Sequence, residues 1–155
     1  MIFVSTGGYK DEYPSKIVEE LFNNGIRNIE LSGGLFEEDL LKKLLKLKKE
    51  INFQLHNYFP APKKSFVLNL ASLNKEIADL TINHIKTAIN WSSQLESKSY
   101  SFHAGFLIDP KPNELGQKIR NRKINNRKEA LSLFIDRVCN LAEFAKIKGV
   151  ELLIE

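Results

Sequence analysis

The stretch Phe53-Gln-Leu-His-Asn-Tyr-Phe-Pro-Ala-Pro62 decides how this sequence is interpreted. Its first residues alternate as a half-buried strand does, with Gln54 and His56 on one face and Phe53 and Leu55 on the other. An aromatic turn stiffened by two prolines follows. We therefore predict a strand that ends in an imidazole and leads straight into a loop.

Two later stretches have the same design. Tyr100-Ser-Phe-His-Ala-Gly-Phe-Leu-Ile-Asp-Pro110 carries His103 at the end of a strand pattern, and Val150-Glu-Leu-Leu-Ile-Glu155 carries Glu155 at the matching place. Two imidazoles and a carboxylate suit Zn²⁺, or Mn²⁺ if further carboxylates join. We predict that His56, His103 and Glu155 are ligands of one divalent metal.

Strand and helix patterns alternate along the whole chain, which predicts a parallel sheet with crossover helices. The expected strands cover about residues 2–5, 26–32, 52–56, 99–105 and 150–155. The expected helices cover about residues 14–22, 37–50, 75–96 and 127–148.

The second to fifth strands each have a polar face, although strands buried on both sides of an open sheet are usually apolar throughout. Asn28, Glu30 and Ser32 line that face in the second strand. Polar side chains can line the inside of a closed barrel when they bond one another, water or a ligand. A (β/α)₈ TIM-type barrel is therefore favoured, with its pocket at the carboxyl ends of the strands.

The chain holds only four βα units and a fifth strand, whereas eight units need about 250 residues. We expect residues 1–155 to be a single domain, the N-terminal half of a (β/α)₈ barrel, and a fragment of a longer protein. The alternative is a natural half-barrel that self-associates through its open edges.

Composition points to one globular domain in the cytoplasm. Apolar residues make up 43% and charged residues 27%, and no apolar run approaches the roughly 18 residues of a membrane span. The one cysteine, Cys139, is expected to be a small core residue in a reducing compartment. The net charge of +4 is too mild for us to expect nucleic acid or a membrane as partner. It comes largely from a basic cluster in the loop 109–126 and the start of the next helix: Lys118, Arg120, Arg122, Lys123, Arg127 and Lys128.

Several residues near the strand ends have two interpretations. Asn57 and Tyr58 either contact a small polar substrate or fix the turn, and Glu30 is either a site residue or a partner for a neighbouring polar group. Gln54 and Ser101 either orient the metal ligands or fill the barrel interior. His84, in the middle of the third helix, is expected to be a packing residue. Gly105 is expected to allow a sharp turn after His103.

Leu55-His-Asn-Tyr-Phe-Pro60, Phe102-His-Ala-Gly-Phe106 and Leu152-Leu-Ile-Glu155 resemble the xylose isomerase-like TIM barrel superfamily. That superfamily includes sugar isomerases and epimerases and the endonuclease IV type of abasic-site nuclease. The resemblance covers the whole chain but only the N-terminal half of the barrel. In the nuclease branch it implies that His56 and His103 bind metal and that Glu155 bridges metals.

In the isomerase and epimerase branch the resemblance implies that Glu155 is both a metal ligand and an acid/base, and that His56 contacts substrate. Our first hypothesis is a metal-dependent sugar or sugar-phosphate isomerase or epimerase, because the aromatic, polar rim suits a small polar substrate. The alternatives are an endonuclease IV-like zinc phosphodiesterase acting on abasic DNA and a non-catalytic truncated half-barrel. Both enzyme branches need further ligands from strands six to eight, so we expect these 155 residues alone to be inactive.

Overall fold

Five parallel strands form one sheet in the order β1-β2-β3-β4-β5. The computed structural model of the protein describes residues 2–9, 11–120 and 122–155. The strands are β1 (Val4–Ser5), β2 (Asn28–Leu31), β3 (Asn52–His56), β4 (Ser99–Phe102) and β5 (Glu151–Ile154). Neighbours in sequence are neighbours in the sheet, which is the order that a TIM-type barrel requires and which confirms the predicted α/β fold class.

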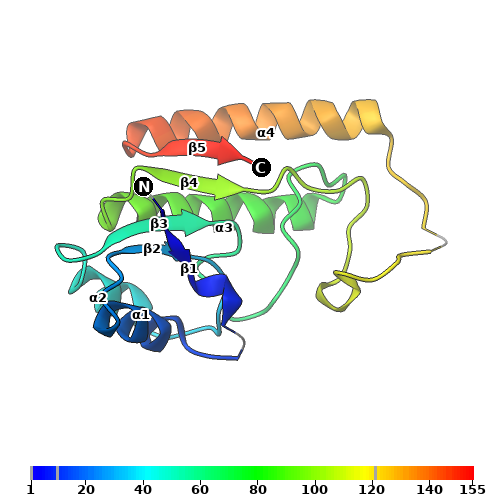
Figure 1. The fold of residues 1–155 in the computed structure, drawn as a ribbon. Coiled ribbons are helices and arrows are strands. Elements are labelled where there is room, and N and C mark those ends of the chain that lie inside the picture. Colours follow the sequence, from blue (N-terminus) through cyan, green and yellow to red (C-terminus); the bar gives the residue numbers. More distant parts are fainter. Residues whose placement is uncertain (1, 10, 121) are drawn as a thin grey trace.

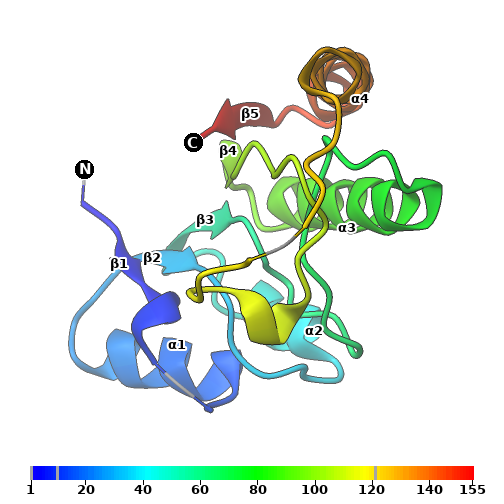
Figure 2. The ribbon, with the colours of Figure 1, turned by 90° about the vertical axis from the view of Figure 1, so that its right-hand side faces the viewer.

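The helices lie on one side of this sheet and leave its other side uncovered by helix (Figure 1). They are α1 (Pro14–Asn23), α2 (Leu40–Leu45), α3 (Lys75–Gln94) and α4 (Arg127–Ile147). Figure 2 looks toward the carboxyl ends of the strands and shows the sheet curving, with the helices around its outer side. The arrangement is that of a partial barrel.

The alternating strand pattern explains which side the helices cover. Ile29 and Leu31 of β2 and Leu55 of β3 are fully buried beneath the helices, and burying each contributes about 1.5–3 kcal/mol. The polar positions match across the strands, since Glu30 pairs in register with Gln54. One face of the sheet therefore supplies the core, and the other presents polar side chains to the barrel interior.

The second helix is shorter than the sequence predicts. We expected a helix over residues 37–50, but α2 is six residues long and continues as tight turns to Glu50. Asp39 has a φ of 58°, a left-handed conformation that prevents the helix from beginning earlier. Glu37 lies outside the helix and bonds elsewhere.

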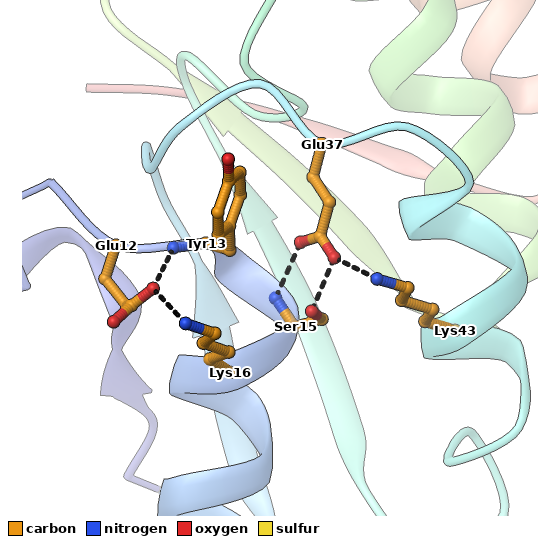
Figure 3. Close-up of polar contacts among 6 residues, drawn as sticks. All are labelled: Glu12, Tyr13, Ser15, Lys16, Glu37 and Lys43. Carbon is orange, nitrogen blue, oxygen red and sulfur yellow. Dashed lines mark hydrogen bonds and ion pairs between the residues drawn. The ribbon is translucent and has the colours of Figure 1, made fainter.

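Glu37 holds the loop before α2 against the beginning of α1 (Figure 3). Its carboxylate accepts hydrogen bonds from the backbone N–H of Ser15 at 3.0 Å and the hydroxyl of Ser15 at 2.5 Å, and it pairs with Lys43 at 2.6 Å. A carboxylate at the first turn of a helix satisfies free N–H groups and the positive end of the helix dipole. Glu37 therefore links α1 to α2.

The prediction for Cys139 is wrong: its side chain is exposed. The helix α4 packs inward through Ala130, Leu141 and Ala145, and Val138 lies against the core on the same side. One residue further along turns about 100° around the helix axis, which takes Cys139 away from the core. The prediction for His84 is confirmed, since it is 8% exposed on the inner face of α3.

Candidate metal and substrate site

Three candidate residues converge at the carboxyl ends of neighbouring strands. His56 ends β3, His103 follows β4, and Glu155 follows β5. The rings of His56 and His103 meet edge to face with centroids 5.2 Å apart, and Nδ1 of His56 lies 3.6 Å from Oε1 of Glu155. Two imidazoles and a carboxylate thus share one rim of the sheet.

The backbone explains this convergence. The strand ladder continues past the ends of the strands, with the N–H of Asn57 donating to the carbonyl of Ser101 at 2.6 Å. On the next pair of strands, the N–H of Glu155 donates to the carbonyl of Phe102 at 3.0 Å. His103 and Glu155 therefore lie at the same level of neighbouring strands, whereas His56 is in register with Ser101, two residues before His103 on the same face of the sheet.

Ser101 is the one side chain that hydrogen-bonds a histidine at this rim, among the residues that the structure describes. Its hydroxyl oxygen lies 2.7 Å from Nδ1 of His56, and Ser101 is 1% exposed. When Nδ1 carries the proton, its N–H donates a hydrogen bond to the hydroxyl oxygen of Ser101, and the lone pair of Nε2 is available to a metal. Metal-binding histidines usually have such a second hydrogen bond, which fixes the ring orientation and the tautomer.

The donor set fits Zn²⁺ or Mn²⁺ in kind, because imidazole nitrogens and a carboxylate oxygen are ordinary ligands of both. The side chain of His56 is 15% exposed and that of Glu155 is 51% exposed, so a cation could reach them. As the side chains lie, residues 2–9, 11–120 and 122–155 contain no group of three or more His, Cys, Asp or Glu that could hold a metal ion. Ligation would therefore require the exposed Glu155 side chain or the imidazoles to rotate.

Asn57, directly after His56, is held by its backbone. Its φ is 43°, and its carbonyl accepts hydrogen bonds from the hydroxyl of Tyr100 at 2.6 Å and from Nε2 of His84 at 3.3 Å. Burial lowers the pKa of His84 to about 4, so its ring is neutral near pH 7. Burial raises the pKa of Tyr100, which remains a hydrogen-bond donor. The side-chain Oδ1 of Asn57 is buried and has no partner among the described residues.

Tyr58 fixes the loop that follows. Its hydroxyl accepts a hydrogen bond from the backbone N–H of Phe66 at 2.7 Å, and its ring stacks on His84 with centroids 5.5 Å apart. Burial raises the pKa of Tyr58. One face and the hydroxyl of Tyr58 are thus engaged within the fold, while the residue also lines a cavity beside His103.

Gln54 and Glu30 lie deeper in the sheet than the histidines. Gln54 precedes His56 by two residues on the same face and lines a cavity of about 340 Å³ with Asn52 and Lys98, toward the other end of the strands. Glu30 faces the same interior from β2, in register with Gln54. Within the described chain, neither side chain forms a hydrogen bond or ion pair. Their register places both of them below the rim, because Gln54 comes two residues before His56.

Asn69 is a residue that no pattern in the sequence singles out. It is 1% exposed, and its amide nitrogen donates to the carbonyls of Phe106 and Ile108 and to the carboxylate of Asp109 at 2.8–3.1 Å. Its amide oxygen accepts from the N–H groups of Phe106 and Ala71 at 3.0 and 3.1 Å. One side chain thus connects the loop after β3 to the loop after β4 and fixes the backbone near His103.

Part of the basic cluster has a structural role. Arg122 donates to the carbonyl of Asp109 at 2.7 Å and pairs with Glu114 at 3.0 Å, which closes the loop between β4 and α4 on itself. Arg127 and Lys128 begin α4 and are exposed.

No helix of the described chain has the length and apolar character needed to cross a membrane.

Comparison with known proteins identifies a family. The family described as xylose isomerase-like TIM barrel matches residues 18–155. No curated protein sequence matches this chain. The family match covers all three residues at the rim.

Solved structures share the fold. A D-tagatose 3-epimerase-like protein has a TM-score of 0.68 at 20% identity, over 92% of this chain and 49% of that one. The 3-keto-D-glucoside 4-epimerase of E. coli has a TM-score of 0.69 at 10% identity, over 98% and 54%. A Thermus thermophilus protein soaked with ZnCl₂ has a TM-score of 0.60 at 20% identity, over 93% and 54%. The chain spans about half the length of these structures.

Proposed function

Because the chain belongs to the xylose isomerase-like TIM barrel family, we propose that it forms part of a metal-dependent sugar or sugar-phosphate isomerase or epimerase site. The observation that carries this proposal is the meeting of His56, His103 and Glu155 at one rim of the sheet. Sugar epimerases among the structures of the same fold support the substrate class.

His56, His103 and Glu155 would hold the metal in this proposal. A bound divalent cation would polarise adjacent oxygens of the sugar and acidify the C–H beside its carbonyl. The chain's own contribution begins with Ser101, which orients the imidazole of His56 through Nδ1.

Glu155 is the acid/base in this proposal. Its half-exposed carboxylate can reach a substrate in the open interior, accept the proton from the C–H and return it to the same or the neighbouring carbon. Epimerisation on the opposite face of the sugar requires a second carboxylate. Asn57 and Tyr58 at the rim, and Gln54 and Glu30 below it, are the proposed substrate contacts.

Paramagnetic broadening tests this site without requiring turnover. Mn²⁺ held by the chain should broaden the NMR resonances of D-fructose or D-tagatose, because the sugar then lies beside the metal. We expect His103→Ala and Glu155→Gln to abolish the protein-dependent broadening. Glu151→Gln is the matched control. Glu151 is an exposed carboxylate at the start of β5, in register with Ser99, and it lies on the same face of the sheet as Glu155.

The nuclease alternative predicts a different result. A duplex with an abasic site would then bind with a steep dependence on salt, and neither sugar would be broadened in the presence of Mn²⁺. That pair of results would contradict the proposed function.

A further inference from the structure

We propose that a cavity of about 420 Å³ beside His103 is a subsite for an apolar substituent of the sugar. The substrate class would then be a sugar that carries an aromatic or aliphatic group in addition to the carbonyl that the proposed chemistry needs. This inference rests on the proposed function, because the sugar itself would lie at the rim formed by His56, His103 and Glu155.

The cavity is continuous with the candidate site. Asn57 and His103 line both of them. The remaining walls come from the loop after β3, through Phe66, and from the loop after β4, through Phe106 and Leu115. A group attached to a sugar at the rim would therefore extend directly into this cavity.

The lining is mostly apolar, with Phe66, Val67, Leu68, Phe106, Pro112 and Leu115 beside four uncharged or imidazole side chains, whereas a sugar alone would need more hydrogen-bonding partners. Among the described residues that line the cavity there is no Asp, Glu, Lys or Arg. Phe106 is 40% exposed and Leu115 is 51% exposed, and both belong to the wall. Exposed apolar side chains gathered in a concave site are typical of ligand pockets with volumes of about 300–1,000 Å³.

Partly buried hydrogen bonds hold the walls in place. The side-chain amide of Asn69 bonds both backbone groups of Phe106. It accepts a hydrogen bond from the N–H at 3.0 Å and donates one to the carbonyl at 3.1 Å. The hydroxyl of Tyr58 accepts from the N–H of Phe66 at 2.7 Å on the other wall. The cavity is thus formed before a ligand arrives, which reduces the entropy lost on binding.

A matched pair of probes tests the subsite: phenyl β-D-glucopyranoside and methyl β-D-glucopyranoside, titrated into the 155-residue chain and followed by protein NMR. We expect the phenyl glycoside to bind at least tenfold more tightly, since its ring removes apolar surface from water. The double variant Phe106→Ala, Leu115→Ala should lose most of this preference and leave the affinity for the methyl glycoside unchanged.

The control is Leu131→Ala, Ile135→Ala, which removes two side chains on α4, each 50% exposed, that do not line the cavity. It should keep the tenfold preference. Equal affinities for the two glycosides, a preference that survives in the Phe106 and Leu115 variant, or no binding of the phenyl glycoside would each overturn the subsite.

His56→Ala separates the subsite from the proposed function. We expect it to weaken both glycosides by the same factor. A phenyl preference together with no effect of His56→Ala on either glycoside would leave the subsite standing and contradict the proposed sugar site. Weakening of both glycosides by His56→Ala without any phenyl preference would support the sugar site and contradict the subsite.

Discussion

The hydroxyl oxygen of Ser101 lies 2.7 Å from Nδ1 of His56, and the two residues face each other in register across β4 and β3. Ser101 is buried, whereas the side chain of His56 is partly exposed at the rim. The sheet itself therefore sets the orientation of an imidazole at the site.

Ser101→Ala should lower the zinc affinity of the chain about tenfold, because loss of a hydrogen bond to a metal-binding histidine typically costs about 10–100-fold. Competition with a chromophoric zinc chelator measures this. Ser99→Ala is the matched control on the same face of β4, two residues earlier, and should leave the zinc affinity unchanged. Equal zinc affinities for Ser101→Ala and the parent chain would show that Ser101 does not position His56.

Gly105 cannot carry a side chain without disturbing Asn69. Its φ is +118°, and a Cβ there would lie 2.6 Å from Oδ1 of Asn69. We expect Gly105→Ala to lower the free energy of unfolding in urea by about 1–3 kcal/mol from backbone strain, and further through the displaced Asn69. Gly116→Ala is the control for strain alone, since its φ is also positive but a Cβ would meet nothing within 4 Å. Equal losses in the two variants would contradict a role for Asn69 in holding the loop.

The neutral, buried imidazole of His84 should make stability depend on pH. Burial lowers its pKa to about 4 in the folded chain, so between about pH 6.5 and 4 the unfolded chain binds a proton that the folded chain does not. The free energy of unfolding should therefore fall as the pH drops through this window, by on the order of 3 kcal/mol. Urea unfolding at several pH values measures the slope.

His84→Gln is the matched variant for that experiment, because glutamine does not titrate and keeps a polar side chain near the carbonyl of Asn57. The slope between pH 6.5 and 4 should become clearly smaller. An unchanged slope would assign the pH dependence to other groups.

Glu37 should stabilise the contact between α1 and α2 in a pH-dependent way. Burial alone would raise its pKa, but hydrogen bonds from Lys43 and Ser15 outweigh burial and lower it. A lowered carboxyl pKa means that the stabilisation is present above about pH 4.5 and is lost as the pH falls further. Glu37→Gln should cost about 1–3 kcal/mol at pH 7 and almost nothing at low pH, whereas the exposed Glu38→Gln should have little effect at either pH.

Much of the site's position could be predicted from the sequence. The alternation in residues 52–56 and 99–103 indicates which side chains share a face, and the strand–helix order indicates that the strands are parallel. Together these two features are enough to bring His56, His103 and Glu155 to one rim. Their chemical roles remain our proposal.

The contacts that hold the rim in place were not predictable. Asn69 bonds residues 37–40 positions away in sequence, and no local pattern indicates which loop amide will be buried. The early residues of the expected second helix also depend on a distant partner, since Glu37 bonds Ser15 across 22 residues. Long-range contacts of this kind cannot be predicted from the spacing of apolar residues, which reflects only neighbours along the chain.

Zinc binding by the purified chain tests the central claim most directly. Titration followed by calorimetry should give one Zn²⁺ per chain, and His56→Ala, His103→Ala and Glu155→Gln should each weaken it at least tenfold, while Glu151→Gln binds as the parent does. If the chain bound no zinc, or if the two histidine variants bound it as tightly as the parent chain, the three side chains at this rim would not be a metal site.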